Sequence, residues 1–170
     1  MDETTASAQA ASVDRAALRA ELERTRAAYR ALVADIGDPK WKLRSGNPAW
    51  TCGQLAWHLG ASGAFVAGLV ENARKGKGTN PPSFLLGPIF KASELRVKFL
   101  SRKATPASVL ADYDAGHERL LRLLDALDDG EFSMSATNFG ETRTIAEQFG
   151  IPVSHFAEHG PEVRSALSSA

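Results

Sequence analysis

Four stretches of this chain carry apolar residues at intervals of three and four, and this spacing limits the possible folds most strongly. It places apolar side chains on one face of a helix, so that each helix can bury that face against the others. No segment alternates apolar and polar residues well enough to predict a β-strand. The pattern predicts an all-α protein, a bundle of four main helices with no internal repeat.

Local start and stop signals predict the limits of these helices. The clearest is the capping box Thr51-Cys52-Gly53-Gln54, in which two side chains can bond each other's backbone N–H groups. Ser12 is the predicted N-cap of the first helix, and Thr105 followed by Pro106 opens the third. Pro152 interrupts the last helix, so we expect a kink or a break near residue 150. The predicted main helices span residues 12–36, 51–75, 105–127 and 144–167.

Two further parts of the chain lie outside these helices. Residues 1–11 have too few apolar side chains to offset the entropy of ordering, which predicts a disordered tail before a single domain at residues 12–170. A long connection separates the second and third helices, and residues 91–102 are predicted as a short additional helix within it. Residues 84–90 are too apolar for an ordinary solvated loop. They could form a lid, a dimer contact or a cover for the end of the bundle.

Composition and charge exclude several classes of function. Lysine and arginine number 20, and so do aspartate and glutamate, so no net field attracts nucleic acid or an anionic membrane. The single cysteine, Cys52, excludes an intramolecular disulfide and a cysteine-rich zinc site. Neither a signal segment nor an apolar run long enough to span a bilayer is found. We therefore expect a soluble cytoplasmic protein whose partner is a small molecule.

Histidines are the remaining strong metal ligands. His155 and His159 are four residues apart, which places both rings on one helical face, although this spacing alone equally fits a structural or surface role. His58 lies on the apolar face of another helix, so two helices of the bundle could bring three imidazoles together. His117 also lies on an apolar face, but no second ligand pairs with it. We favour a core histidine there and keep it as a reserve ligand.

The segment from His155 to His159 also fits a second motif. His155-x-x-Glu158-His159 matches the inverted zincin pattern, in which two histidines bind zinc and a glutamate acts as general base. A peptidase of this class is expected to take a further ligand from downstream, where the sequence offers only Glu162, and to need a larger scaffold. We therefore expect Glu158 either to orient a metal-binding histidine by a hydrogen bond to its other ring nitrogen or to face solvent.

Two segments resemble the signatures of a known family. Trp50-Thr51-Cys52-Gly53-Gln54-Leu55-Ala56-Trp57-His58-Leu59 resembles the second-helix signature of the DinB-like superfamily, and Thr144-Ile145-Ala146-Glu147-Gln148 through His155 and His159 resembles its last-helix signature. The resemblance covers residues 12–167 in the same order of helices. It implies a four-helix bundle, often a homodimer, whose metal, commonly zinc or nickel, is bound at the positions of His58, His155 and His159.

The superfamily contains several activities. Its members include transferases that use mycothiol, bacillithiol or glutathione, and a mycothiol-dependent maleylpyruvate isomerase. This sequence has His155 where the isomerase is expected to have a glutamate, and it lacks that enzyme's additional C-terminal domain. We therefore do not expect isomerase activity.

The predicted ligand set has its own chemical consequence. Three neutral imidazoles leave the charge of a divalent ion uncompensated and a coordination position open, which favours an added anion. Our first hypothesis is a thiol-dependent S-transferase, because a bound thiol, with an ordinary pKa of about 8.5, would be deprotonated. The alternatives are a metal-hydroxide hydrolase of small molecules and a non-catalytic bundle that senses metal, is stabilised by it or associates with a partner.

Other side chains give weaker signals, and no catalytic residue is assigned. Cys52 lies in the first turn of its helix, where backbone N–H groups can make a thiol reactive, although a packed cysteine is the favoured interpretation. Arg143, Arg164 and Lys91 could bind a substrate carboxylate. The sequence does not distinguish such a role from an ordinary solvated surface.

Overall fold

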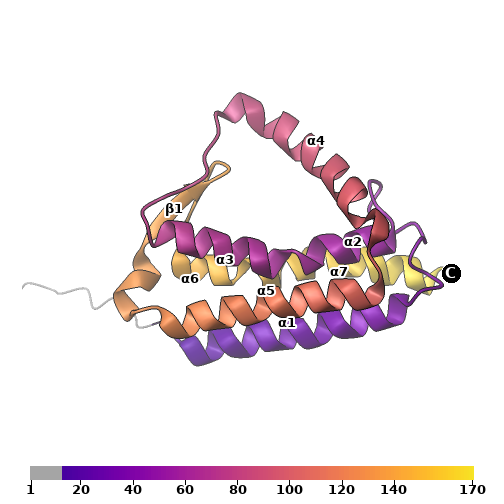
Figure 1. Cartoon of the computed structure of the whole chain (residues 1–170), viewed down its shortest axis with the longest axis horizontal. Helices are drawn as coiled ribbons and strands as arrows, with labels where there is room; N and C mark the ends of the chain where they lie inside the picture. Colours follow the sequence, from indigo (N-terminus) through magenta and orange to yellow (C-terminus); the bar gives the residue numbers. More distant parts are fainter. Residues whose placement is uncertain (1–12) are drawn as a thin grey trace, which may run out of the picture.

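The computed structural model describes residues 13–170, which form a bundle of long helices with one further helix set diagonally beside it (Figure 1). The predicted tail at residues 1–11 and the predicted N-cap Ser12 lie outside the described residues. The first helix, α1 (Arg15–Ile36), has Asp14 as its N-cap, whose carboxylate accepts a hydrogen bond from the backbone N–H of Ala17. The helix therefore begins slightly later than predicted.

Four helical units make up the bundle, which confirms the predicted all-α fold. The first unit is α1, the second is α2 (Cys52–Gly60) with α3 (Ser62–Ala73), the third is α5 (Pro106–Ala126), and the fourth is α6 (Ile145–Phe149) with α7 (Ile151–Ser168). The predicted break at Gly150 is present. The second unit was predicted to be continuous but breaks at Ala61, among the weak helix formers Gly60, Ser62 and Gly63. None of the described helices combines the length and hydropathy needed to cross a membrane.

The apolar core consists of two clusters, one on each side of the helix breaks. The first joins α3, α5 and α6 through residues such as Val66, Leu120 and Phe149. The second joins α1, α2 and α7 and includes Leu55 and Val163. Val153 packs against the first cluster and Phe156 against the second. The segment of α7 that carries His155 therefore lies where the two clusters meet.

A helix, α4 (Ser83–Leu100), occupies the long connection between the second and third units. It includes residues 84–90 and is much longer than the helix predicted at residues 91–102. The prolines near its start account for the error: Pro82 is its N-cap, and Pro88 lies inside the helix, where it removes one backbone donor without ending it. Figure 1 shows α4 running diagonally from the region of β1 toward α2. Its first half is open to solvent, since Phe84 is 76% exposed.

A β-hairpin precedes α6, so the prediction of no strand is wrong. Strands β1 (Ser135–Asn138) and β2 (Glu141–Thr144) pair antiparallel, with Ser135 opposite Thr144 and Asn138 opposite Glu141. Each strand has only four residues, and Ala136 is the one fully buried side chain, so no alternating apolar pattern exists in the sequence. A short three-ten helix, η2 (Asp129–Ser133), precedes β1, and another, η1 (Ser101–Lys103), follows α4.

Candidate metal centre

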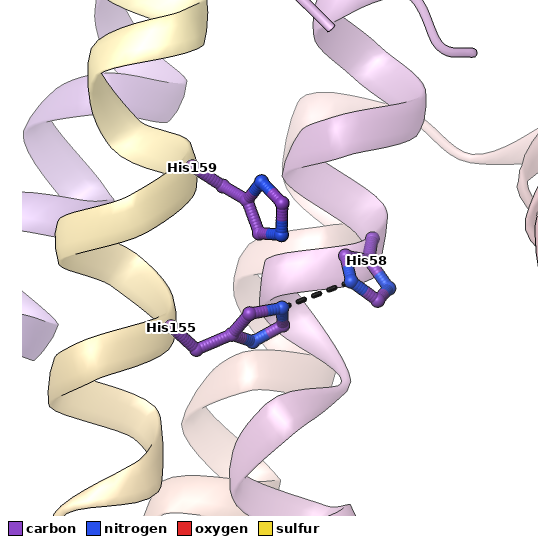
Figure 2. A group of neighbouring side chains, drawn as sticks. All are labelled: His58, His155 and His159. Atoms are coloured by element: carbon purple, nitrogen blue, oxygen red, sulfur yellow. Dashed lines mark hydrogen bonds between the residues drawn. The ribbon is translucent and has the colours of Figure 1, made fainter. Parts of the chain in front are cut away.

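Three histidines meet between α2 and α7, as the sequence analysis expected of a metal site (Figure 2). His58 projects from α2, and His155 and His159 project from successive turns of α7. The Nε2 atoms of His58 and His155 are 2.9 Å apart, and one ligand atom from each of the three rings lies within 4.8 Å of the others. Such a cluster could hold one metal ion.

Helix capping determines where His58 lies on its helix. The Thr51 hydroxyl accepts a hydrogen bond from the backbone N–H of Gln54 at 3.3 Å, and the Gln54 side chain accepts one from the backbone N–H of Thr51 at 3.0 Å. The predicted capping box is thus confirmed. It starts α2 less than two turns before His58 and leaves little freedom in the direction of that side chain.

The break at Gly150 makes α7 a helix separate from α6. Pro152 lies in its first turn, where a backbone N–H would have no acceptor within the helix, so the lack of one at proline costs no hydrogen bond. His155 follows within the next turn, and His159 lies on the same face one turn further on. The orientation of this pair is therefore set by the packing of α7 on α1 and α2 rather than by the hairpin before α6.

An indole ring closes one side of the cluster. The ring of Trp50 lies 4.7 Å from that of His58 and 6.4 Å from that of His159, measured between centroids. Its Nε1–H donates to the backbone oxygen of Glu94 in α4, at 3.4 Å. Trp50 is buried, so it separates this side of the three rings from water and links them to α4.

The carboxylate of Glu162 orients the His159 ring through its Nδ1 atom. The Nδ1 of His159 lies 2.7 Å from Oε2 of Glu162, and because a carboxylate oxygen accepts, Nδ1 carries the proton and Nε2 keeps its lone pair. Glu162 is itself held by the side-chain amide of Asn47, at 3.3 Å, and its backbone oxygen accepts from the N–H of Gly46, at 2.8 Å. This role of Glu162 was not predicted from the sequence. The three-residue spacing from His159 on one helix was the available signal.

Glu158 differs from Glu162 in its surroundings. It is exposed, and in the described part of the chain it forms no hydrogen bond with the three histidines. Of its two expected positions, the structure gives the one that faces solvent. Glu162, the downstream residue of the inverted zincin interpretation, instead contacts the outer nitrogen of His159. This arrangement does not support that interpretation.

Burial keeps two of the three rings neutral. Burial, with the nearby rings of His155 and His159, lowers the pKa of His58 to about 3. Burial and the neighbouring His159 lower the pKa of His155 to about 4, partly opposed by the negative charge of Glu158. At neutral pH both side chains therefore offer lone pairs rather than protons, as metal coordination requires.

His117 and Cys52 lie away from the cluster. His117 is buried in α5 against the ring of Tyr113, with centroids 5.9 Å apart, and its Nε2 lies 3.3 Å from a Glu23 oxygen without hydrogen-bond geometry. This position agrees with a core histidine. Cys52 is fully buried, and burial raises the pKa of its thiol. It is therefore a packed residue rather than a reactive one.

The three basic side chains considered for a substrate carboxylate have partners within the chain. Arg143 pairs with Glu141 at 2.6 Å, and Lys91 pairs with Glu94 at 2.8 Å. The Arg164 guanidinium lies 5.4 Å from the centre of the Phe156 ring. Of the three, Arg143 alone lines the cavity beside the histidines.

A cavity of about 800 Å³ adjoins the cluster. His58 and His155 form part of its wall, and the rest comes from further residues of α2 and α7 and from α3, α4, the hairpin and α6. Most of the exposed wall area is apolar, but many of the lining side chains are polar or charged, among them Arg96, Glu141, Arg143, Gln148 and Glu158. A volume of this size can hold a small organic molecule next to the two rings.

Comparison with known proteins places the chain in a family. The model of the DinB superfamily matches residues 21–163. The chain belongs to the DinB superfamily. No curated protein matches it.

Solved structures share the fold. The crystal structure of a mycothiol-dependent maleylpyruvate isomerase superposes with a TM-score of 0.71 and 12% identity, over 89% of this chain and 61% of that chain. A histidine-to-alanine mutant of that isomerase gives a TM-score of 0.70, with the same identity and coverage. The chain thus spans about three fifths of the length of these neighbours, and at this identity the likeness concerns the fold alone.

Proposed function

We propose that this chain is a metal-dependent S-transferase, which joins a low-molecular-weight thiol such as mycothiol to an electrophilic small molecule. His58, His155 and His159 would hold the divalent ion, with zinc as the first expectation and nickel as the second. The observation that carries the proposal is the meeting of these three imidazoles beside a cavity large enough for a substrate.

The chemistry of the donor set fits such an ion. Imidazole nitrogens suit both zinc and nickel. His58 and His155 are neutral because of burial, and the bond from His159 to Glu162 directs the remaining lone pair of that ring away from the carboxylate. When bound, the ion would supply positive charge that stabilises the thiolate form of a thiol at neutral pH.

The residues of the chain would bind and orient the two substrates. Trp50 shields one side of the histidines from water, and the apolar wall of the cavity would hold the acceptor. The thiol sulfur forms the new bond to an electrophilic carbon, the thiol proton passes to solvent, and a leaving group departs with its electron pair. No side chain is required to form a covalent intermediate.

The test is thiol transfer by the zinc-reconstituted protein with mycothiol, bacillithiol or glutathione and an electrophilic acceptor. We expect consumption of the thiol to depend on the metal and to be lost in His155→Ala. A His155→Ala protein with full metal content and full transfer rate would contradict the proposal. Turnover of esters or amides without thiol would favour the metal-hydroxide hydrolase. Inactivity toward all acceptors, with thermal stability unchanged by chelation, would favour an interaction role.

Membership of the superfamily extends the proposal to assembly and location. We propose a homodimer that acts in the cytoplasm, since the resemblance to the superfamily implies a bundle that is often dimeric. Light scattering of the purified protein measures the assembly directly. A monomeric mass at micromolar concentration would contradict the dimer without affecting the proposed chemistry.

A further inference from the structure

We infer that the cavity beside the histidines binds an aromatic compound with a hydrogen-bond-accepting substituent, and that Phe139 and Gln148 select it. Three phenylalanine rings from separate elements line this cavity: Phe65 of α3, Phe90 of α4 and Phe139 of the hairpin turn. The Phe139 ring is 6.4 Å from that of Phe65 and 6.5 Å from that of Phe90, between centroids. Rings at this spacing already pack against each other, and the exposed surface that Phe65 and Phe90 keep suits an aromatic guest.

The two-residue turn of the hairpin requires positive φ at both of its positions, and a phenylalanine, Phe139, occupies the first. Its φ is 54°, in the left-handed region, and Gly140 follows with a φ of 89°. Asparagine or glycine normally occupies such a turn position, and a bulky residue there is an outlier that costs of order 1 kcal/mol. This backbone conformation places the half-buried Phe139 ring at the cavity wall, close to the rings of Phe65 and Phe90.

The hairpin tip is anchored rather than loose. The backbone N–H of Phe139 donates to the oxygen of Thr79 at 2.8 Å, and the N–H of Gly140 donates to the Asn80 side chain at 2.9 Å. Asn138 accepts from the N–H of Thr79, also at 2.8 Å. These bonds tie the turn to the segment that leads into α4. The Phe139 ring is therefore presented in one position, as a specificity-determining residue should be.

Gln148 supplies the polar contact. Its side chain is fully buried, it lines the same cavity as His58 and His155, and neither Oε1 nor Nε2 has a hydrogen-bond partner within the described chain. Leaving a buried polar atom unsatisfied costs about 1–3 kcal/mol. When a compound binds, the Gln148 side chain would have to turn slightly toward the cavity, so that Nε2 donates to an oxygen of the compound and recovers part of that cost.

The assignment of this compound as the electrophile rests on the function proposed above, but its binding does not. Binding is therefore measured in the zinc-loaded protein without any thiol. The probe is 1-anilinonaphthalene-8-sulfonate, an aromatic compound whose sulfonate oxygens accept hydrogen bonds and whose fluorescence rises in an apolar site. We expect saturable binding of one probe per chain.

Three variants locate the bound probe. Phe139→Asn removes the ring and suits the left-handed turn, and Gln148→Met replaces the amide with an apolar side chain of similar length, so neither should lower the melting temperature. We expect each to weaken binding about fivefold or more. Phe84→Ser is the matched control, because Phe84 is an exposed phenylalanine of α4 outside the cavity wall, and it should leave binding unchanged.

The outcomes separate this inference from the proposed function. Unchanged affinity in both cavity variants, or weakening by Phe84→Ser alone, would overturn the inference, since the probe would then lie on the exposed face of α4. Weakening in one cavity variant alone would overturn the role of the other residue. Cavity binding without any thiol transfer would contradict the transferase alone. Thiol transfer with unchanged probe affinity in both variants would contradict the inference alone.

Discussion

At the scale of single residues, the histidine site depends on one carboxylate that the spacing of the ligands does not reveal. His155 and His159 could be predicted from their four-residue separation, and His58 from its place on an apolar face. The three-residue spacing of Glu162 from His159 was a signal, but spacing alone does not assign the role of Glu162 or that of Gln148. Their roles depend on which groups lie next to them in the fold. Glu162 lies beside Nδ1 of His159, whereas the Gln148 amide has no hydrogen-bond partner among the described residues.

Removal of the Glu162 charge tests this arrangement. Glu162→Gln should weaken zinc affinity about 10- to 100-fold, because the carboxylate that orients a metal-binding imidazole also raises its basicity. Competition with a chromogenic chelator measures the affinity. Glu158→Gln is the matched control, with the same change of charge on the same helix but no bond to a ligand ring. Equal weakening in both variants would mean that overall charge, not the bond to His159, is responsible.

The pH dependence of stability follows from the two lowered histidine pKa values. In metal-free protein the folded-state pKa values of His58 and His155 are about 3 and 4, against an ordinary value of 6.5. Between these limits the unfolded chain binds more protons, so stability is complete above about pH 6.5 and falls as pH decreases toward 4. Urea unfolding with chelator present, at pH 7.5, 6.0 and 5.0, should show this decrease.

The control for the pH series is a chain that lacks both titrating groups. The double variant His58→Gln, His155→Gln should have a flatter dependence of unfolding free energy on pH over the same range. The two ion pairs of Arg26 and Arg30 with Asp114 keep the pKa of that carboxyl low and should not titrate there. A pH dependence identical to that of the unmodified chain would assign the effect to other groups.

At the scale of helices and strands, the sequence was informative wherever a local signal was strong. The capping box at Thr51, the N-cap Thr105 followed by Pro106, and the break near Gly150 could be predicted directly from short motifs. The hairpin could not, because one buried alanine gives no alternation. The extent of α4 was also missed, since Pro88 inside an apolar run resembles a loop more than a helix that tolerates one lost hydrogen bond.

The close packing of α3 on α5 gives a test at this scale. A Cβ atom at Gly116 would lie 2.7 Å from the backbone nitrogen of Ala64, so Gly116→Ala must displace one helix and should destabilise the protein by about 1–3 kcal/mol. Gly68→Ala in α3 is the control, because nothing lies within 4 Å of its Cβ position, and it should stabilise by up to about 1 kcal/mol. Urea unfolding compares the two. Stabilisation by both would mean that the helices do not approach as closely as described.

At the scale of the whole molecule, two helices far apart in the sequence share one site. The ligands come from α2 and α7, which the second core cluster holds together with α1. A metal ion bound there would link α2 to α7 and should stabilise the fold. Local patterns could not establish this meeting of α2 and α7, which depends on how the helices pack.

Chelation tests the coupling of metal binding to folding. A ligand present at 100 times its dissociation constant adds about 2.7 kcal/mol to the free energy of unfolding. Treatment of the zinc-loaded protein with EDTA should therefore lower its melting temperature by several degrees, and added zinc should restore it. His58→Ala should not respond to either treatment. A melting temperature unaffected by chelation in the unmodified protein would mean that no bound ion contributes to the fold.

The central claim, that His58, His155 and His159 together hold one divalent ion, is tested most directly by metal analysis of the purified protein and of His58→Ala. We expect about one metal ion per chain in the unmodified protein and loss of stoichiometric metal in the variant, with circular dichroism confirming that both remain helical. His117→Gln should retain its metal. A folded His58→Ala protein that still holds one ion per chain would contradict the claim.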